Sequence, residues 1–181
     1  MRLPTFAFLI CYSFACVVHG EEARLARFVD TSIIFRDDMS HAQAYPHTLQ
    51  VFLKIRNRRD GELSWIPAGI SAELFDSTGK PVPMPPSAAS IRSSDSQLTI
   101  PYGSSLDLLI SNGGISMMGD AGNSYALIVG CRGWYIPRDS VSSYSLRIRL
   151  YGYLGYDKLP NDPPDPTLLI DMPLTKIQLT K

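Results

Sequence analysis

The chain has 181 residues, enough for one well-packed domain and too few for two. Apolar residues make up 45% and charged residues 19%, and the 13 glycines and 14 prolines fall short of a low-complexity composition, so the sequence predicts a folded chain. Basic and acidic side chains number 17 each, which excludes an overall field that would draw in nucleic acid or an anionic membrane.

The first twenty residues are typical of a signal peptide. A short basic start at Arg2 is followed by the uncharged stretch 5–18, which is too short to span a bilayer comfortably. Val18 and Gly20 are small enough for the positions that signal peptidase reads, so we expect cleavage near Gly20. The mature chain would then be secreted or periplasmic, with no stable membrane span.

Two alternatives concern the same segment. An uncleaved anchor would need a longer apolar run, and lipid attachment at Cys16 would need an aliphatic residue three positions earlier, where Ser13 stands. Removal of residues 1–20 leaves Cys131 as the single cysteine, so no intramolecular disulfide can form. The absence of paired cysteines and of Asn-x-Ser/Thr acceptors favours a bacterial periplasmic or surface protein.

Strand periodicity begins at residues 48–56, where Leu49, Val51, Leu53 and Ile55 alternate with polar or exposed positions. The same two-residue rhythm returns in three later segments, at 106–110, 125–129 and 146–150. Weaker strand candidates lie at 31–35, 70–75, 97–100 and 133–136, and a last one at 168–179. Pro173 should interrupt that last strand, because proline cannot donate to the ladder.

Turn-forming residues separate these runs, and the only helical possibility is the short segment 21–28. About eight short strands in one domain predict an all-β fold, an antiparallel β-sandwich with a barrel as the second possibility. We divide the chain into the signal peptide, residues 1–20, an N-terminal extension with the first strand, residues 21–47, and the sandwich domain, residues 48–181.

Three segments carry a resemblance. LQVFLKIRN at residues 49–57, AELFDSTGKPVP at 72–83 and LTIPYGSSLDLLIS at 98–111 are similar to the immunoglobulin-like or fibronectin-like domains of bacterial secreted proteins. The cysteine, tryptophan, cysteine spacing of antibody domains is absent. The resemblance therefore implies a scaffold with a binding role, and it assigns a function to no individual residue.

Little in the sequence points to an enzyme. The mature chain has two histidines, His41 and His47, and lacks HExxH, GxSxG and phosphate-binding glycine loops, so we expect no catalysis and no cofactor. Met39, His41 and His47, behind two aspartates, could form a copper or zinc site, because methionine with histidine suits Cu(I) and carboxylate with histidine suits Zn(II). The alternative is a solvated polar loop, which Pro46 favours.

Tyr151, Tyr153 and Tyr156 lie among glycines and precede a loop rich in aspartate and proline. Such tyrosines could present aromatic faces to a sugar or a protein partner, or simply end a half-buried strand. Asp157, Asp162 and Asp165 suggest calcium, but the EF-hand spacing with its glycine and terminal glutamate is missing.

The loop at residues 111–124 is long for a hairpin connection and carries Met117 and Met118. Exposed adjacent methionines would form an adaptable contact patch, and the alternative is a loop tucked over one end of the core. We expect Cys131 to be buried rather than a reactive thiolate beside Arg132, because unpaired cysteines usually behave as small buried hydrophobes. Trp65 and Trp134 should be buried because large aromatics dominate the interiors of small sandwiches.

The sequence therefore predicts an exported, non-catalytic binding or accessory module with a protein or carbohydrate partner and no nucleic acid. Two alternatives stay open. One is a small periplasmic copper- or zinc-binding protein, and the other is a protease inhibitor that acts through the 111–124 loop.

Overall fold

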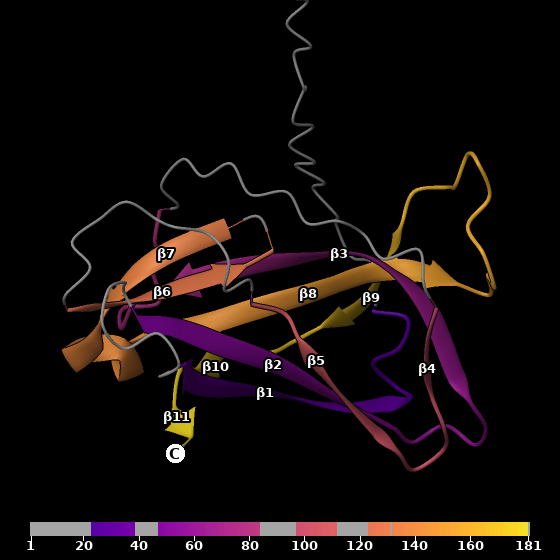
Figure 1. Ribbon diagram of the computed structural model, residues 1–181, viewed down its shortest axis with the longest axis horizontal. Coiled ribbons are helices and arrows are strands. Elements are labelled where there is room, and N and C mark those ends of the chain that lie inside the picture. The colour runs from indigo at the N-terminus through magenta and orange to yellow at the C-terminus, as the bar shows by residue number, and fades with distance from the viewer. Residues whose placement is uncertain (1–22, 39–46, 84–96, 112–122, 131, 181) are drawn as a thin grey trace, which may run out of the picture.

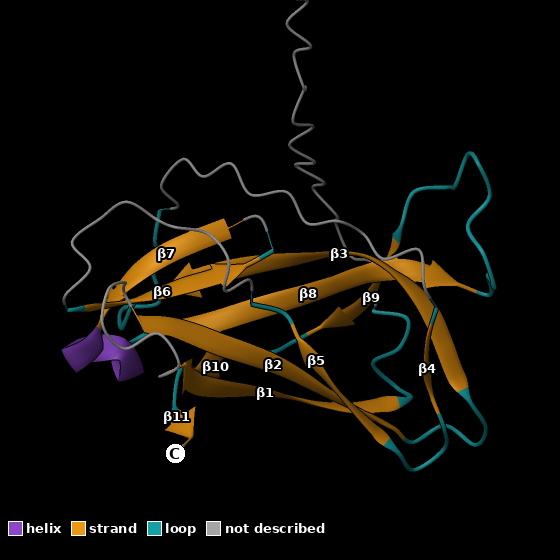
Figure 2. Cartoon of the chain, viewed as in Figure 1, coloured by secondary structure: helices purple, strands orange, loops and turns teal. Residues whose placement is uncertain are grey.

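The computed structural model describes residues 23–38, 47–83, 97–111, 123–130 and 132–180. In this part of the chain eleven strands form two sheets, and one short 3-10 helix, η2 (Arg138–Ser143), is present (Figures 1 and 2). The predicted all-β sandwich is confirmed, with eleven strands in place of about eight. No helix among the described residues is long and apolar enough to cross a membrane.

The six-stranded sheet is built around one central strand, β2, and has the order β11-β1-β2-β6-β7, with β5 also paired to β2. β2 pairs with β1 antiparallel over ten residues, and β6 and β5 share its other edge, β6 in parallel at residues 47–48 and β5 antiparallel at residues 52–56. The strands of this sheet are β1 (Val29–Asp38), β2 (His47–Asn57), β5 (Ser105–Leu109), β6 (Ser124–Val129), β7 (Arg132–Pro137) and β11 (Leu179–Thr180).

The five-stranded sheet is organised by the long antiparallel pair of β3 and β8. Its order is β10-β8-β3-β4, and β9 shares with β10 the edge of β8 that faces away from β3. Its strands are β3 (Leu63–Phe75), β4 (Leu98–Ile100), β8 (Ser145–Leu154), β9 (Thr167–Asp171) and β10 (Thr175–Lys176).

The core lies between the two sheets and follows the alternation of the sequence. Leu53 and Ile55 of β2, and Leu146 and Ile148 of β8, are fully buried and belong to one hydrophobic cluster. Their neighbours Lys54 and Arg56 are exposed, because successive side chains of a strand point to opposite faces. Trp65 and Trp134 are buried in this cluster as expected.

Two local expectations were incomplete or wrong, and a third was confirmed. β3 begins seven residues before the predicted 70–75 segment, because a bulge between Pro67 and Gly69 breaks the alternation that marks a strand in the sequence. The described part of the 21–28 segment forms hydrogen-bonded turns and no helix. Around Pro173 the prediction is confirmed: β9 ends at Asp171 and β10 begins at Thr175.

Candidate functional site

A pocket of about 650 Å³ lies at one end of the five-stranded sheet. Three parts of the chain form its walls: the turns at residues 23–28, residues 59 and 62–64 around the start of β3, and residues 154–155 at the end of β8. In Figure 1 these parts meet on the right-hand side, where the indigo segment before β1 approaches the beginnings of β3 and β4. The volume falls in the range of known small-ligand pockets.

The pocket exists because β8 stops pairing before β3 does. The last residue of β8, Leu154, lies opposite Trp65, and Gly155 then turns the chain away with a φ of +79°, a value that favours glycine. β3 extends further back to Leu63, where it pairs with Ile100 of β4 on its other side. One edge of β3 therefore faces the pocket at residues 62–64.

The turns at residues 23–28 are fixed to the sandwich at both ends. The N–H groups of Arg24 and Leu25 donate to the carbonyl oxygens of Leu168 (3.2 Å) and Leu169 (2.9 Å), and the Arg58 N–H donates to the carbonyl oxygen of Phe28 (2.8 Å). Leu25 is only 2% exposed and belongs to the core cluster. Burial of one leucine side chain contributes about 2 kcal/mol to the stability of the fold. Residues 23–28 are therefore held against the sandwich as one wall of the pocket.

Asn57 holds the neighbouring loop in place from a fully buried position. Its Nδ2 donates to the carbonyl oxygens of Gly61 (2.8 Å) and Ile100 (2.9 Å), and its Oδ1 accepts from the Arg59 N–H (2.8 Å). A buried amide with three partners strongly resists displacement, because each lost bond would leave a polar group without water. The Arg59 backbone at the pocket wall is therefore fixed.

Positive charge dominates the pocket lining. Arg24, Arg27 and Arg59 line it against one carboxylate, Glu62, and all four side chains are exposed. The guanidinium carbons of Arg27 and Arg59 lie over the ring of Phe28, 4.7 and 5.6 Å from its centroid. Among the described residues, none forms an ion pair with these three arginines. The lining thus offers guanidinium donors beside an aromatic and aliphatic floor.

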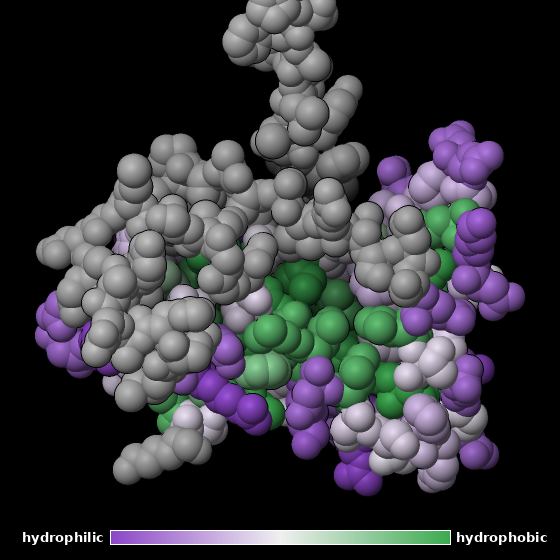
Figure 3. Space-filling model, viewed as in Figure 1, coloured by the Kyte–Doolittle hydropathy of each residue, from purple (hydrophilic) through white to green (hydrophobic). Residues whose placement is uncertain are grey.

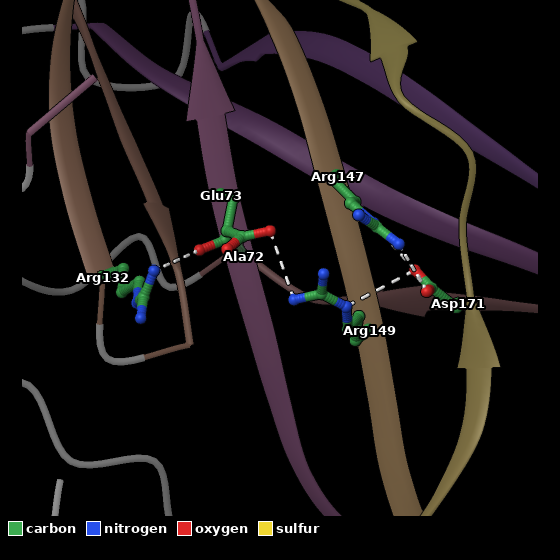
Figure 4. A network of polar contacts seen from close by, with 6 residues as sticks. All are labelled: Ala72, Glu73, Arg132, Arg147, Arg149 and Asp171. Atoms are coloured by element: carbon green, nitrogen blue, oxygen red, sulfur yellow. Dashed lines mark hydrogen bonds and ion pairs between the residues drawn. The ribbon is translucent and has the colours of Figure 1, made fainter. Parts of the chain in front are cut away.

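Several arginines elsewhere in the described chain have acidic partners. On the five-stranded sheet, Arg147 makes a bidentate contact with Asp171 at 2.7 and 3.0 Å, and Arg149 lies between Glu73 (3.2 Å) and Asp171 (3.6 Å) (Figure 4). The hydrogen bond from Arg147 to Asp171 raises the pKa of the Arg147 guanidinium. Because this network joins β3, β8 and β9 across one sheet face, we interpret it as cross-strand stabilisation.

The predicted tyrosines lie on or just after β8, and none of the three is among the residues that line the pocket. Tyr151 and Tyr153 belong to β8, and Tyr156 follows the turn at Gly155; all three are half-buried. The rings of Tyr153 and Tyr156 meet edge to face, with centroids 6.3 Å apart and planes at 83°, and the two pocket residues 154 and 155 lie between them in the chain. This pair fits a packed strand end, the alternative that the sequence left open for these tyrosines.

Most other predicted site residues lie outside the described part of the chain: Met39, His41, Met117, Met118 and Cys131. His47 is the first residue of β2, and its side chain is also outside the described part. The described residues contain no group of three or more His, Cys, Asp or Glu side chains that could hold a metal ion. Asp157, Asp162 and Asp165 are exposed in the loop between β8 and β9.

A row of apolar side chains crosses the outer face of the six-stranded sheet. Ile34, Phe52 and Leu109 are cross-strand neighbours, Leu109 is 51% exposed, and the Arg36 guanidinium lies 4.8 Å from the centre of the Phe52 ring. Figure 3 shows apolar side chains gathered in the middle of this face. Patches of a few side chains are common on monomeric proteins, so we assign this row no function.

The arginine-lined pocket was not predicted from the sequence. Its signal was present as two short basic segments, ARLARF at residues 23–28 and RNRR at residues 56–59. Residues 29–55, a stretch of 27, separate them, so only the fold shows that they share a pocket. Comparisons of the chain with protein-family models, with curated proteins and with solved structures gave no match.

Proposed function

We propose that this protein is an exported, non-catalytic binding module that holds an anionic ligand, such as a carboxylate, in the arginine-lined pocket. The observation that carries the proposal is the set of three guanidiniums, Arg24, Arg27 and Arg59, that line the pocket without a carboxylate partner among the described residues. Arginine presents its donors as a planar fork that matches a carboxylate or phosphate. The sandwich supplies the rigid frame that such a site requires.

The stacking on Phe28 supports the same conclusion. Because the guanidiniums of Arg27 and Arg59 both lie over this ring, their positions are restricted before a ligand arrives. Less side-chain entropy is then lost on binding, at a typical cost of about 0.5–1.5 kcal/mol for each immobilised side chain. The pocket is thus organised in advance for an anion.

The proposal includes export of the protein and an immunoglobulin-like scaffold. A short uncharged segment after Arg2, with Val18 and Gly20 before two glutamates, supports signal-peptide cleavage near Gly20 and a secreted or periplasmic location. The two-sheet architecture, together with the proposed resemblance of residues 49–150 to immunoglobulin-like domains, supports a binding scaffold. Cell fractionation with N-terminal sequencing tests export; an unprocessed chain in the cytosol would contradict it.

Calorimetric titration with anions tests the site. We expect the processed protein to release heat with citrate and with a glutamate-rich peptide, and the affinity to fall as salt rises, because exposed charges are screened. Arg27→Gln and Arg59→Gln should each weaken binding about tenfold or more, the loss that follows from one charge-assisted hydrogen bond. Thermal unfolding of each variant checks that the fold is intact.

Arg56→Gln is the matched control, since Arg56 is exposed, lies on β2 near Arg59 and does not line the pocket. It removes the same charge from the same region and should leave the affinity within about twofold. Absence of heat with every anion, or an equal loss in Arg56→Gln and Arg59→Gln, would refute an anion-binding pocket. The latter result would indicate only a diffuse effect of net charge.

A further inference from the structure

We infer that the anionic ligand is an acidic peptide in extended conformation, which adds as a short strand to the free edge of β3 at residues 62–64. This inference rests on the proposed function and names the ligand class of the same pocket. It brings together three observations: an unpaired strand edge that lines the pocket, guanidiniums beside that edge, and buried apolar side chains beneath it.

The free edge is the first observation. Leu63, Ser64 and Trp65 pair with β4 on one side, and on the other side β8 provides its last partner, Leu154, opposite Trp65. At residues 62–64 no described segment pairs with the β8-facing edge, and these residues line the pocket. An unpaired edge offers backbone N–H and C=O groups, which an extended peptide can satisfy by strand addition.

The charges beside the edge are the second observation. Arg24, Arg27 and Arg59 line the same pocket as Leu63 and Ser64, so a strand added here would run beside three guanidiniums and one carboxylate, Glu62. A peptide with acidic side chains would therefore gain charge-assisted hydrogen bonds in addition to the backbone bonds. A basic peptide would meet net repulsion.

The floor of the pocket argues against a lipid chain. Leu25 and Leu63 are each only 2% exposed, so the apolar surface left for an acyl tail comes from small or partly buried side chains, Ala23, Ala26, Phe28 and Leu154. A tail placed there would also bury the N–H and C=O groups of the β3 edge without hydrogen bonds, at a cost of about 1–3 kcal/mol for each group. A free inorganic anion would satisfy the guanidiniums and leave the same edge unused.

The test uses an acetylated, amidated pentapeptide of alternating glutamate and leucine, and the same peptide with glutamine in place of glutamate. Two further versions carry N-methyl groups, one on the leucine nitrogens and one on the glutamate nitrogens. Successive N–H groups of a strand point to opposite sides, so strand addition requires only one of these two sets. The wild-type protein and Arg56→Gln are titrated with all four peptides by calorimetry.

We expect the unmodified peptide to bind both proteins, the glutamine peptide to bind at least tenfold more weakly, and one N-methylated peptide alone to lose affinity, on the order of tenfold. Amide hydrogen exchange at residues 62–64 should slow when the unmodified peptide is added. Strand addition would be overturned if the two N-methylated peptides had equal affinities, either both as tight as the unmodified peptide or both weaker. If citrate still bound, the anion-binding pocket itself would stand.

The chain supplies one competing occupant of its own, because Glu21 and Glu22 directly precede the pocket residue Ala23. The double variant Glu21→Gln/Glu22→Gln removes the negative charges of this competing segment. We expect the unmodified peptide to bind this variant and the wild type within about threefold of each other. If the peptide bound the double variant and not the wild type, the chain's own acidic residues would be the occupant of the pocket, and the inference of an external peptide ligand would be overturned.

Discussion

Replacing Gly152 with alanine is the sharpest test of how β8 is packed. A methyl group at Gly152 would lie 2.6 Å from the carbonyl oxygen of Ile66, 2.7 Å from Cδ1 of Leu169 and 3.3 Å from Cδ1 of Trp65. The first of these atoms belongs to the backbone of β3, and Leu169 and Trp65 are fully buried, so none of the three can move aside at low cost. The strands themselves would have to separate locally.

The expected loss follows from this geometry. Adding a methyl group to a packed interior costs about 1–3 kcal/mol, and a clash with a carbonyl oxygen places Gly152→Ala at the upper end of that range. With a urea dependence of about 1–3 kcal/mol per molar, the unfolding midpoint should fall by about 1–3 M. The fluorescence of the buried Trp65 and Trp134 reports the transition directly.

Gly69→Ala is the matched control on the neighbouring strand. A methyl group at Gly69 would meet no atom within 4 Å, and Gly69 does not need a positive φ. Its free energy of unfolding should stay equal to that of the wild type or rise by up to about 1 kcal/mol, because alanine restricts the unfolded chain. Equal stabilities of Gly152→Ala and Gly69→Ala would refute the packing described for β8.

Three further outcomes are expected. Asn57→Ala should lower the free energy of unfolding by about 2–4 kcal/mol in urea titrations, because it removes three hydrogen bonds and leaves the Ile100 carbonyl without its side-chain donor. A loss below about 1 kcal/mol would contradict the role of this amide. A double-mutant cycle of Arg147→Gln and Asp171→Asn should give a coupling of about 0.5–1 kcal/mol, reduced by the partial exposure of both side chains, and additive effects would count against the ion pair. Hydrogen bonds from Thr78 and Lys80 lower the pKa of Asp76, so the stability that Asp76 contributes is present above its unfolded pKa and lost as pH falls through its folded pKa. Asp76→Asn should therefore flatten the fall of the melting temperature below about pH 4, and parallel curves of melting temperature against pH for the two proteins would show that Asp76 has no part in it.

Much of the fold was readable from the sequence because it depends on local alternation. The inward positions Leu53, Ile55, Leu146 and Ile148 were predicted from their two-residue spacing, and all four are buried between the sheets. Pro173 marked the break between β9 and β10 for a similarly local reason, the missing N–H group. Each of these features is decided by residues within a few positions of one another.

The candidate site could be predicted only in fragments. The aromatic spacing of Tyr153 and Tyr156 pointed to the end of β8, and the structure brings these two rings together. Arg24 and Arg59 are individually visible as basic residues, but their shared pocket depends on the bond from Arg58 to Phe28 and on the early end of β8 at Leu154. No local pattern encodes those two contacts.

The sequence by itself therefore determined which side chains of strands such as β2 and β8 point inward, since the direction of a side chain along a strand follows from the backbone at that point. Only the tertiary structure decided which strands share an edge, where β3 is left unpaired and which arginines gather beside it. The reason is that strand pairing and bulges are set by contacts between residues far apart in the chain, such as Gly152 with Ile66 and Leu25 with Leu169. Such contacts exist only once both sheets have formed.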